Sequence, residues 1–289
     1  MMRRFITVDA NRPAAGARLP SGRDMHRYLL AALVAAVPCL VFATYYFGIR
    51  ILIMAAVAFV AGAAVEIAFS LVRKKPVTGG TLVFAVLLTL MLPPTIPLWM
   101  VALASVFGTF FGKEVFGGTG HHIFSPVLLG KGFLMFSYPT VVKGSYFGSM
   151  LGSSYPDAWI SCSAAILVGG IAMVIARREN LLVLAGLLFA AGSLAVAMGH
   201  SGHLPYGSML EFMVADGFLF GACFLVCDPA CSPHDRAGKL LYGMSIGAIA
   251  VLMRCFSNYS DAMMSAILMG NLFAPLVDAL ALLGNESEE

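Results

Sequence analysis

The chain has 289 residues, of which 60% are hydrophobic and only 11% are charged, and its formal net charge is +3. This composition is typical of a membrane protein and argues against a soluble globular domain, and the small net charge gives no nucleic-acid-binding signature. The six cysteines do not form a secreted disulfide framework, because nearly all of them fall inside apolar runs.

In chain order, the first 25 residues lack the apolar core and the small-residue cleavage site of a signal peptide, so we expect a retained polar tail at 1–26. Apolar runs of about 17–25 residues can cross a bilayer as helices. Clear runs lie at 28–48, 51–72, 159–176, 181–198, 238–253 and 262–283. Runs broken by proline or polar residues lie at 80–94, 97–116 and 208–227, and a short run lies at 123–138. The sequence therefore predicts an all-α polytopic membrane protein with about ten transmembrane helices.

Lysine and arginine gather in the tail and in the loops after even-numbered spans, and short loops rich in these residues stay in the cytoplasm. These residues are Arg3, Arg4, Arg12, Arg18, Arg23, Arg27, Arg73, Lys74, Lys75, Lys113, Arg177, Arg178, Arg236 and Lys239. The opposite side holds little beyond Arg50 and Lys143, with Arg254 near a span end. Both termini are therefore predicted to be cytoplasmic.

Two parts of the chain resemble each other. SPVLLGKGF (125–133) aligns with SAILMGNLF (265–273), and LMLPPTIP (90–97) aligns with VCDPACSP (226–233). We expect two five-helix repeats, at 27–139 and 158–284, with a loop at 140–157 between them and an acidic tail at 285–289. Because five is odd, the second repeat would be inverted. Helices broken by Pro or Gly at matching positions of inverted halves indicate a central site for an ion or polar ligand.

The stretch GKEVFGGTGHHIFSP (112–126) interrupts the apolar pattern. Glu114 is costly to bury as a charge and should face water or meet a cation. Lys113 is an alternative partner, although adjacent helix positions point in different directions. Gly117, Gly118 and Gly120 permit unusual turns, and carbonyls freed there would suit a hard cation together with a carboxylate. A tight turn needs the same glycines, so both an ion entry and a simple turn remain open.

Two further patterns raise the question of a metal site. Cys223, Cys227 and Cys231 fall at i, i+4 and i+8, but cysteine also packs as a small apolar residue, and Pro229 is expected to end the helix before Cys231. The adjacent histidines at 121–122 are a poor metal site by themselves. We predict no metal site, and we find no nucleotide-binding loop and no catalytic Ser/His/Asp arrangement.

The runs at 112–139, 224–243 and 265–278 resemble corresponding stretches of one family. They read GKEVFGGTGHHIFSPVLLGKGFLMFSYP, FLVCDPACSPHDRAGKLLYG and SAILMGNLFAPLVD. The family comprises the NqrB protein of the sodium-pumping NADH:quinone oxidoreductase (Nqr) and the RnfD protein of the Rnf complex, and the similarity extends to 34–48 and 92–108. It implies a ten-helix subunit of a respiratory complex in the bacterial inner membrane, which couples electron transfer to movement of Na+ or H+. Partner subunits, NADH oxidation on one of them, and a quinone are implied as well.

Acidic residues within the matching stretches are implicated in ion transport by this resemblance. They are Glu114, Asp228 and Asp278, with Gly117, Gly118 and Gly120 at the ion entry. Asp228 has an alternative role as the acceptor of an Asx-type turn before proline. Glu66 and Asp216 also lie within spans, but no matched motif supports them.

The resemblance further implies FMN or riboflavin, because family members carry FMN bonded to a Thr in a D-G-x-S-G-A-T type motif between the halves. That motif is missing here, and the loop between the halves is short. Thr140 is the only threonine nearby, and without the motif we predict no covalent FMN.

Two alternatives to an ion-translocating subunit remain. One is a paralogue without flavin that acts as a scaffold or ion path, which the shortened loop favours. The other is a stand-alone channel for a small solute such as urea, which two inverted five-helix halves would also suit. The acids at the matched positions argue against the second alternative.

Overall fold

The computed structural model describes residues 22–74, 77, 79–142, 158–176, 180–200, 217–233, 235–256 and 261–286. Every regular element in these ranges is helical. In the first half these elements are α1 (Gly22–Phe47), α2 (Arg50–Arg73), α3 (Gly80–Met91), α4 (Leu98–Thr109), the π-helical η1 (Phe110–Glu114) and α5 (Pro126–Ser137). In the second half they are α7 (Ala158–Ala176), α8 (Asn180–His200), α10 (Phe218–Phe220), the π-helical η3 (Gly221–Leu225), α11 (Arg236–Phe256) and α12 (Ala262–Glu286).

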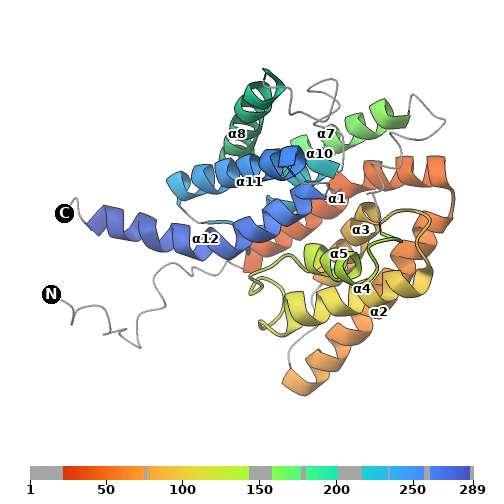
Figure 1. Cartoon of the computed structure of the whole chain (residues 1–289). Helices are drawn as coiled ribbons and strands as arrows, with labels where there is room; N and C mark the ends of the chain where they lie inside the picture. The colour runs from red at the N-terminus through yellow and green to blue at the C-terminus, as the bar shows by residue number, and fades with distance from the viewer. Residues whose placement is uncertain are drawn as a thin grey trace.

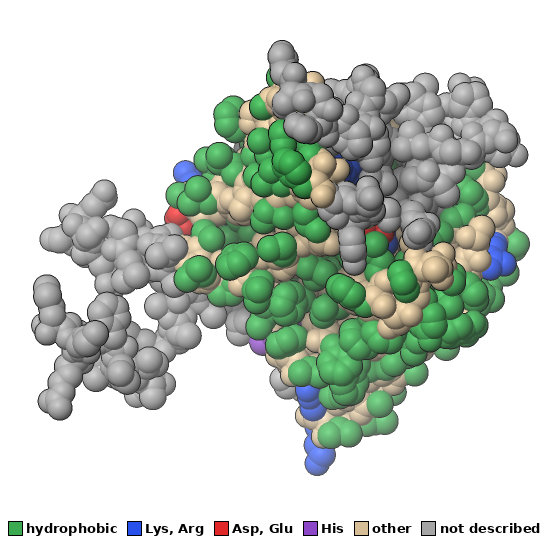
Figure 2. Space-filling view, in the orientation of Figure 1, with side chains coloured by type: hydrophobic (Ala, Val, Ile, Leu, Met, Phe, Trp, Pro, Cys, Tyr) green, Lys and Arg blue, Asp and Glu red, His purple; other side chains and the backbone are tan. Residues whose placement is uncertain are grey.

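The helices confirm a polytopic membrane protein. Four of them are long and apolar enough to cross a bilayer, namely α1, α2, α8 and α11. α1 begins at Gly22, within the expected tail at 1–26, and α12 continues to Glu286. Figure 2 shows hydrophobic side chains over most of the described face. Large hydrophobic side chains such as those of Val60 and Leu71 are exposed, which suits contact with lipid.

The short helices α3 and α5 differ from the predicted spans. Each has 12 residues, which is about 18 Å of helix and well short of the roughly 30 Å hydrocarbon core. The segment between α3 and α4 nevertheless contacts the N-terminal end of α2. Arg50, at the start of α2, donates from Nε to the carbonyl of Pro94 (2.7 Å) and from Nη2 to the carbonyl of Ile96 (2.9 Å). The break after α3, which contains a turn closed by a hydrogen bond from the Ile96 N–H to the Pro93 carbonyl, is therefore held at the start of α2.

Both predicted helix breaks are present. Residues 92–97 separate α3 from α4, and residues 226–233 separate η3 from α11. Proline alone does not mark such a break, because Pro38 lies inside α1 and Pro275 lies inside α12. The first break has two consecutive prolines, and in the second an aspartate precedes the proline and accepts backbone hydrogen bonds that close a turn.

The helices pack in two groups with α1 against both. In Figure 1, α2, α4 and α5 lie together on one side, and α8, α11 and α12 lie together on the other. α1 packs against α7 and also contacts α2 and α3. Small residues allow close approach within each group, as expected for helices that pack in a membrane. A Cβ on Gly130 would lie 2.5 Å from the carbonyl oxygen of Ala104, and a Cβ on Gly186 would lie 2.5 Å from that of Leu240.

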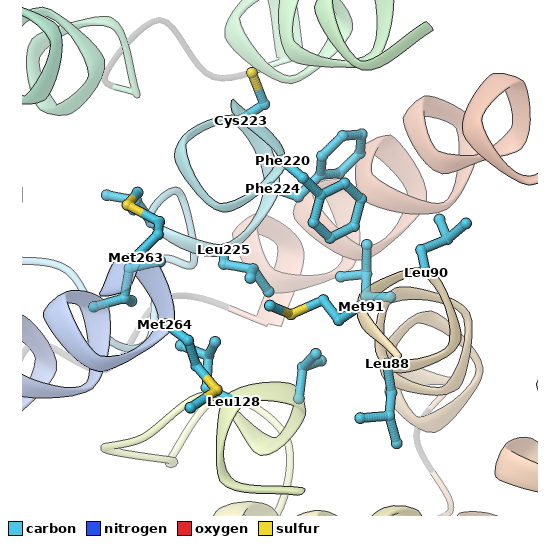
Figure 3. Close-up of a cluster of buried hydrophobic side chains, with 14 of the residues drawn as sticks. Leu88, Leu90, Met91, Leu128, Phe220, Cys223, Phe224, Leu225, Met263 and Met264 are labelled. Atoms are coloured by element: carbon cyan, nitrogen blue, oxygen red, sulfur yellow. The ribbon is translucent and has the colours of Figure 1, made fainter. Parts of the chain in front are cut away.

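Apolar side chains fill the centre of the molecule. Figure 3 shows Met91, Leu128, Leu225 and Met264 converging from α3, α5, η3 and the start of α12, with Phe224 beside them. The rings of Phe220 and Phe224 are stacked, with centroids 4.8 Å apart. Within the described ranges, the centre of the molecule is therefore an apolar core.

Candidate functional site

A buried ionic network joins the C-terminal half of α2 to η1. Lys113 Nζ lies 2.8 Å from Glu66 Oε1 and 3.7 Å from Glu114 Oε1, and it donates to Thr81 Oγ1 at 2.9 Å. The Thr81 hydroxyl in turn donates to Glu66. Lys113 is fully buried, and Glu66 and Glu114 are only 4% and 5% exposed. We call Glu66, Arg73, Thr81, Lys113 and Glu114 the α2–η1 network.

The helix geometry at η1 explains how adjacent residues enter one network. α4 runs directly into η1, where π-helical turns are wider than α-helical turns and are often found at functional sites. Lys113 pairs more closely with Glu66 of α2 than with its neighbour Glu114, which agrees with the expectation that adjacent positions pair poorly. The interaction of Glu66 was not predicted, although it is the single acid in an otherwise apolar helix and so carried a signal.

Arg73 completes the network at the end of α2. Its Nη1 lies 3.6 Å from Glu114 Oε2, and its Nη2 donates to the Glu114 carbonyl at 2.6 Å. Arg50 and Arg73 lie at opposite ends of α2, about 35 Å apart along the helix. Glu114 therefore lies at the same end of α2 as Arg73 and Lys74.

The glycines after η1 form the turn that the sequence suggested. Gly117, Gly118 and Gly120 have φ values of 118°, 104° and 92°, which residues with a side chain rarely adopt. The backbone N–H of Gly118 donates to the Lys113 carbonyl, and that of Gly117 donates to the Glu114 carbonyl. The carbonyls of Lys113 and Glu114 therefore accept hydrogen bonds within the turn.

Hydroxyl groups extend the network along α2. A Cβ on Gly62 would lie 2.9 Å from Ser105 Oγ and 3.0 Å from Thr109 Oγ1, so both hydroxyls face the helix one turn before Glu66. Ser105 Oγ donates to the carbonyl of Ala58 at 2.6 Å. A series of polar groups therefore runs between α2, α3 and α4 from Arg73 toward the middle of α2.

Asp228 lies in a different buried group. His122 Nε2 is 2.9 Å from Asp228 Oδ2, and the backbone N–H of Ala230 donates to Asp228 Oδ1 at 3.0 Å. The second bond confirms the Asx-type turn that was the structural alternative for Asp228. Cys231 lies beyond the helix, as expected from Pro229, so it does not share a helix face with Cys223.

The structure also shows a buried ion pair that the sequence analysis missed. Lys131 Nζ of α5 lies 2.7 Å from Asp261 Oδ1, directly before α12, and both side chains are at most 1% exposed. A lysine within a short apolar helix was the available signal, but its partner is 130 residues away in the sequence. This pair links the first half of the chain to the second.

The remaining predicted residues contribute less. Asp278 lies in α12, but its side chain is outside the described residues, as is the whole of Asp216. Thr140 is exposed in the turn after α5, where the N–H groups of Val141 and Val142 point to the carbonyl of Tyr138. Those donors are therefore committed to the turn and do not form a phosphate-binding site at Thr140.

Comparison with known proteins agrees with the resemblance seen in the sequence. The family described as "NQR2, RnfD, RnfE family" matches residues 14–151 and 142–282. The chain is 33% identical over 267 residues to the NqrB protein of the Na(+)-translocating NADH-quinone reductase of Ectopseudomonas mendocina, and 34% identical over 268 residues to that of Azotobacter vinelandii. Each match covers 80% of this chain and 66% of the relative, so the chain spans just under two thirds of their length.

Another relative matches over a larger share of the chain. The chain is 32% identical over 311 aligned positions to the corresponding NqrB protein of Pseudomonas aeruginosa, and this match covers 92% of the chain and 76% of the relative. Apart from the last four residues of α12, the helices, the two proline-containing breaks and the glycine turn after η1 lie inside the matched regions. With a family match over nearly its whole length, this polytopic helical chain belongs to the NQR2, RnfD, RnfE family.

Proposed function

We propose that the chain is a membrane subunit of an electron-transfer complex of the Nqr or Rnf type, and that it contributes a path for Na+ or H+ across the bacterial inner membrane. Its relatives are named as subunits of a Na+-translocating NADH-quinone reductase. On this proposal both termini are cytoplasmic, NADH is oxidised on a partner subunit, and a quinone is the electron acceptor of the complex.

The α2–η1 network carries the proposal. Charged side chains within membrane helices are costly, and they commonly mark ion or proton paths. The two carboxylates and two cations of the network balance in charge, with Lys113 held between Glu66 and Glu114. The ammonium group of Lys113 thus lies where a transported cation would contact the two carboxylates. A Na+ ion or a proton that reaches Glu114 would displace Lys113 from one carboxylate, and the lysine would restore neutrality after the ion leaves.

The direction of the path follows from the polar groups beside the network. Glu114 with Arg73 lies at the end of α2, and Thr81, Ser105 and Thr109 continue inward from Glu66. Hydroxyl and carboxylate oxygens are suitable ligands for a hard cation and can also relay protons. Glu114 is the proposed entry, and Asp278 in the second half is the proposed counterpart by family resemblance, with Asp228 between the halves.

Inverted five-helix repeats at 27–139 and 158–284 are part of the proposal. The packing of the two halves supports it, because α2 packs against α4 and α4 against α5, while α8 packs against α11 and α11 against α12. A π-helical segment also occurs in each half, as η1 and as η3. Such repeats commonly enclose an ion site near the middle of the membrane.

Flavin is not assigned a step in this function. Family resemblance implies FMN or riboflavin, but the described surroundings of Thr140 offer it neither a sequence motif nor free backbone donors. The shortened loop favours a second candidate function, in which the chain keeps the ion path but carries no electrons.

Turnover of the complex in proteoliposomes tests the proposal. We expect Glu114→Gln, Glu66→Gln and Asp278→Asn to leave the complex assembled but to lower cation-stimulated quinone reduction, while Glu286→Gln at the end of α12 serves as the matched control. Raising the Na+ concentration should partly rescue Glu114→Gln if Glu114 concentrates cations at the entry. The proposal fails if all three variants keep the wild-type dependence on Na+ and on pH. Cation leakage without redox turnover would favour the second candidate.

A further inference from the structure

Three side chains with metal-ligating atoms meet at the junction of the two halves. His122 follows the glycine turn of the first half, and Asp228 and Cys231 lie in the break between η3 and α11 of the second half. One ligand atom from each residue lies within 4.8 Å of the other two. The three residues are 1%, 2% and 4% exposed, respectively, so the group is closed off from solvent.

The group contains polar atoms that its present hydrogen bonds do not satisfy. His122 Nδ1 is buried and has no hydrogen-bond partner within the described part of the chain. Next to the group, the Tyr242 hydroxyl donates to Asn271 Oδ1 at 2.6 Å, and Tyr242 lies within electrostatic range of Asp228 and Cys231. The Nδ2 atom of Asn271 is likewise without a partner among the described residues. Native interiors rarely leave such atoms unsatisfied, and a bound ion is one accepted explanation.

We propose that His122, Asp228 and Cys231 bind a divalent transition-metal ion of the Zn2+ class. An imidazole nitrogen, a carboxylate oxygen and a thiolate sulfur are the ligand types that Zn2+ takes, whereas Na+, Mg2+ and Ca2+ prefer oxygen alone. Three protein ligands would leave the fourth position of a tetrahedral Zn2+ site for a water molecule or another ligand. Zn2+ has no redox chemistry, so the site needs no electron donor or acceptor.

The proton balance of binding follows from the contacts. The Cys231 thiol loses its proton to solvent and becomes the thiolate that binds the metal. His122 Nε2 currently faces Asp228 as a hydrogen-bond partner. When Nε2 binds the metal, the neutral imidazole carries its hydrogen on Nδ1, the atom that now has no partner. In the present structure Nε2 donates its hydrogen to the Asp228 carboxylate, so metal binding at Nε2 breaks this hydrogen bond and moves the hydrogen to Nδ1.

Such a site would fasten the two halves of the chain together, because His122 is 106 residues from Asp228. It would also fix the side chain of Asp228 at the junction of the two halves. The inference does not depend on the proposed function, since metal binding can occur with or without turnover.

Binding of Co2+ and Zn2+ to the purified full-length chain in detergent tests the site. After chelator treatment, titration with Co2+ should produce one thiolate-to-cobalt charge-transfer absorption band per chain, and elemental analysis after Zn2+ loading should give one zinc per chain. Cys231→Ser should abolish the charge-transfer band, and His122→Gln and Asp228→Asn should each weaken Co2+ binding by about tenfold or more.

Matched variants distinguish metal binding at this site from metal binding by other side chains and from loss of the fold. Cys227→Ser removes another buried thiol, whose Sγ contacts the Ala222 carbonyl, and His121→Gln changes the exposed neighbouring histidine. Both should bind Co2+ like the wild type. A variant that elutes as an aggregate is replaced by Cys231→Ala, which keeps an apolar packing group. The proposal is overturned if wild type binds no Co2+ or Zn2+, or if Cys227→Ser removes binding as completely as Cys231→Ser does.

Discussion

Replacing Lys113 with methionine should be the most destabilising single change in the α2–η1 network. Lys113 is fully buried and is the common partner of Glu66 at 2.8 Å and Glu114 at 3.7 Å. Removing one member of a buried ion pair typically costs about 3–5 kcal/mol, because the remaining charge is left without compensation. Lys113→Met leaves two buried carboxylates, with Arg73 Nη1 3.6 Å from Glu114 Oε2.

Glu66→Gln should cost less than Lys113→Met, because Lys113 can still pair with Glu114 and an amide oxygen can still accept from Thr81. The double variant should be less destabilised than the sum of the two single changes, because it removes both partners of the closest pair. Unfolding of the purified protein in detergent, followed by circular dichroism against denaturant, measures all three free energies.

Lys74→Met is the matched control, since Lys74 is exposed directly after α2 and its loss should change stability by no more than about 0.5 kcal/mol. The reasoning would be refuted if Lys113→Met were as stable as the wild type, or if Glu66→Gln were the more damaging change. Additive costs in the double variant would show that the two residues do not interact.

Three other predictions concern the fold and the cofactor. Arg50→Met should destabilise the protein by roughly 1–3 kcal/mol for each of the two carbonyls it leaves unsatisfied in the break after α3, and normal stability would contradict that role. Gly243→Ala should lower the unfolding midpoint by forcing α11 away from the Val183 carbonyl, whereas Gly199→Ala, which meets open space, should not; equal effects would rule out the close contact. Intact-mass measurement should show no FMN increment on the chain, and an increment mapped to Thr140 would prove this prediction wrong.

The sequence by itself determined the class of the protein and much of its helix pattern. Runs of apolar residues predict membrane helices because each backbone polar group must be satisfied within the bilayer, and this constraint is local to the chain. The breaks at 92–97 and 226–233 and the turn at Gly117, Gly118 and Gly120 were also predictable, because they depend on local residue types. Proline and glycine act on the backbone at their own positions.

The partners of the buried charges were decided only by the tertiary structure. Lys113 was considered as a partner of Glu114, although adjacent positions pair poorly, and its closest partner in the structure is Glu66 on another helix. Asp261 meets Lys131 across 130 residues. The group of His122, Asp228 and Cys231 is likewise invisible in a sequence where His122 is more than 100 residues from the other two. Burying a charged side chain costs free energy unless a partner compensates the charge. The sequence shows which charged side chains lie in apolar segments, but only the packing of the helices determines which groups become their partners.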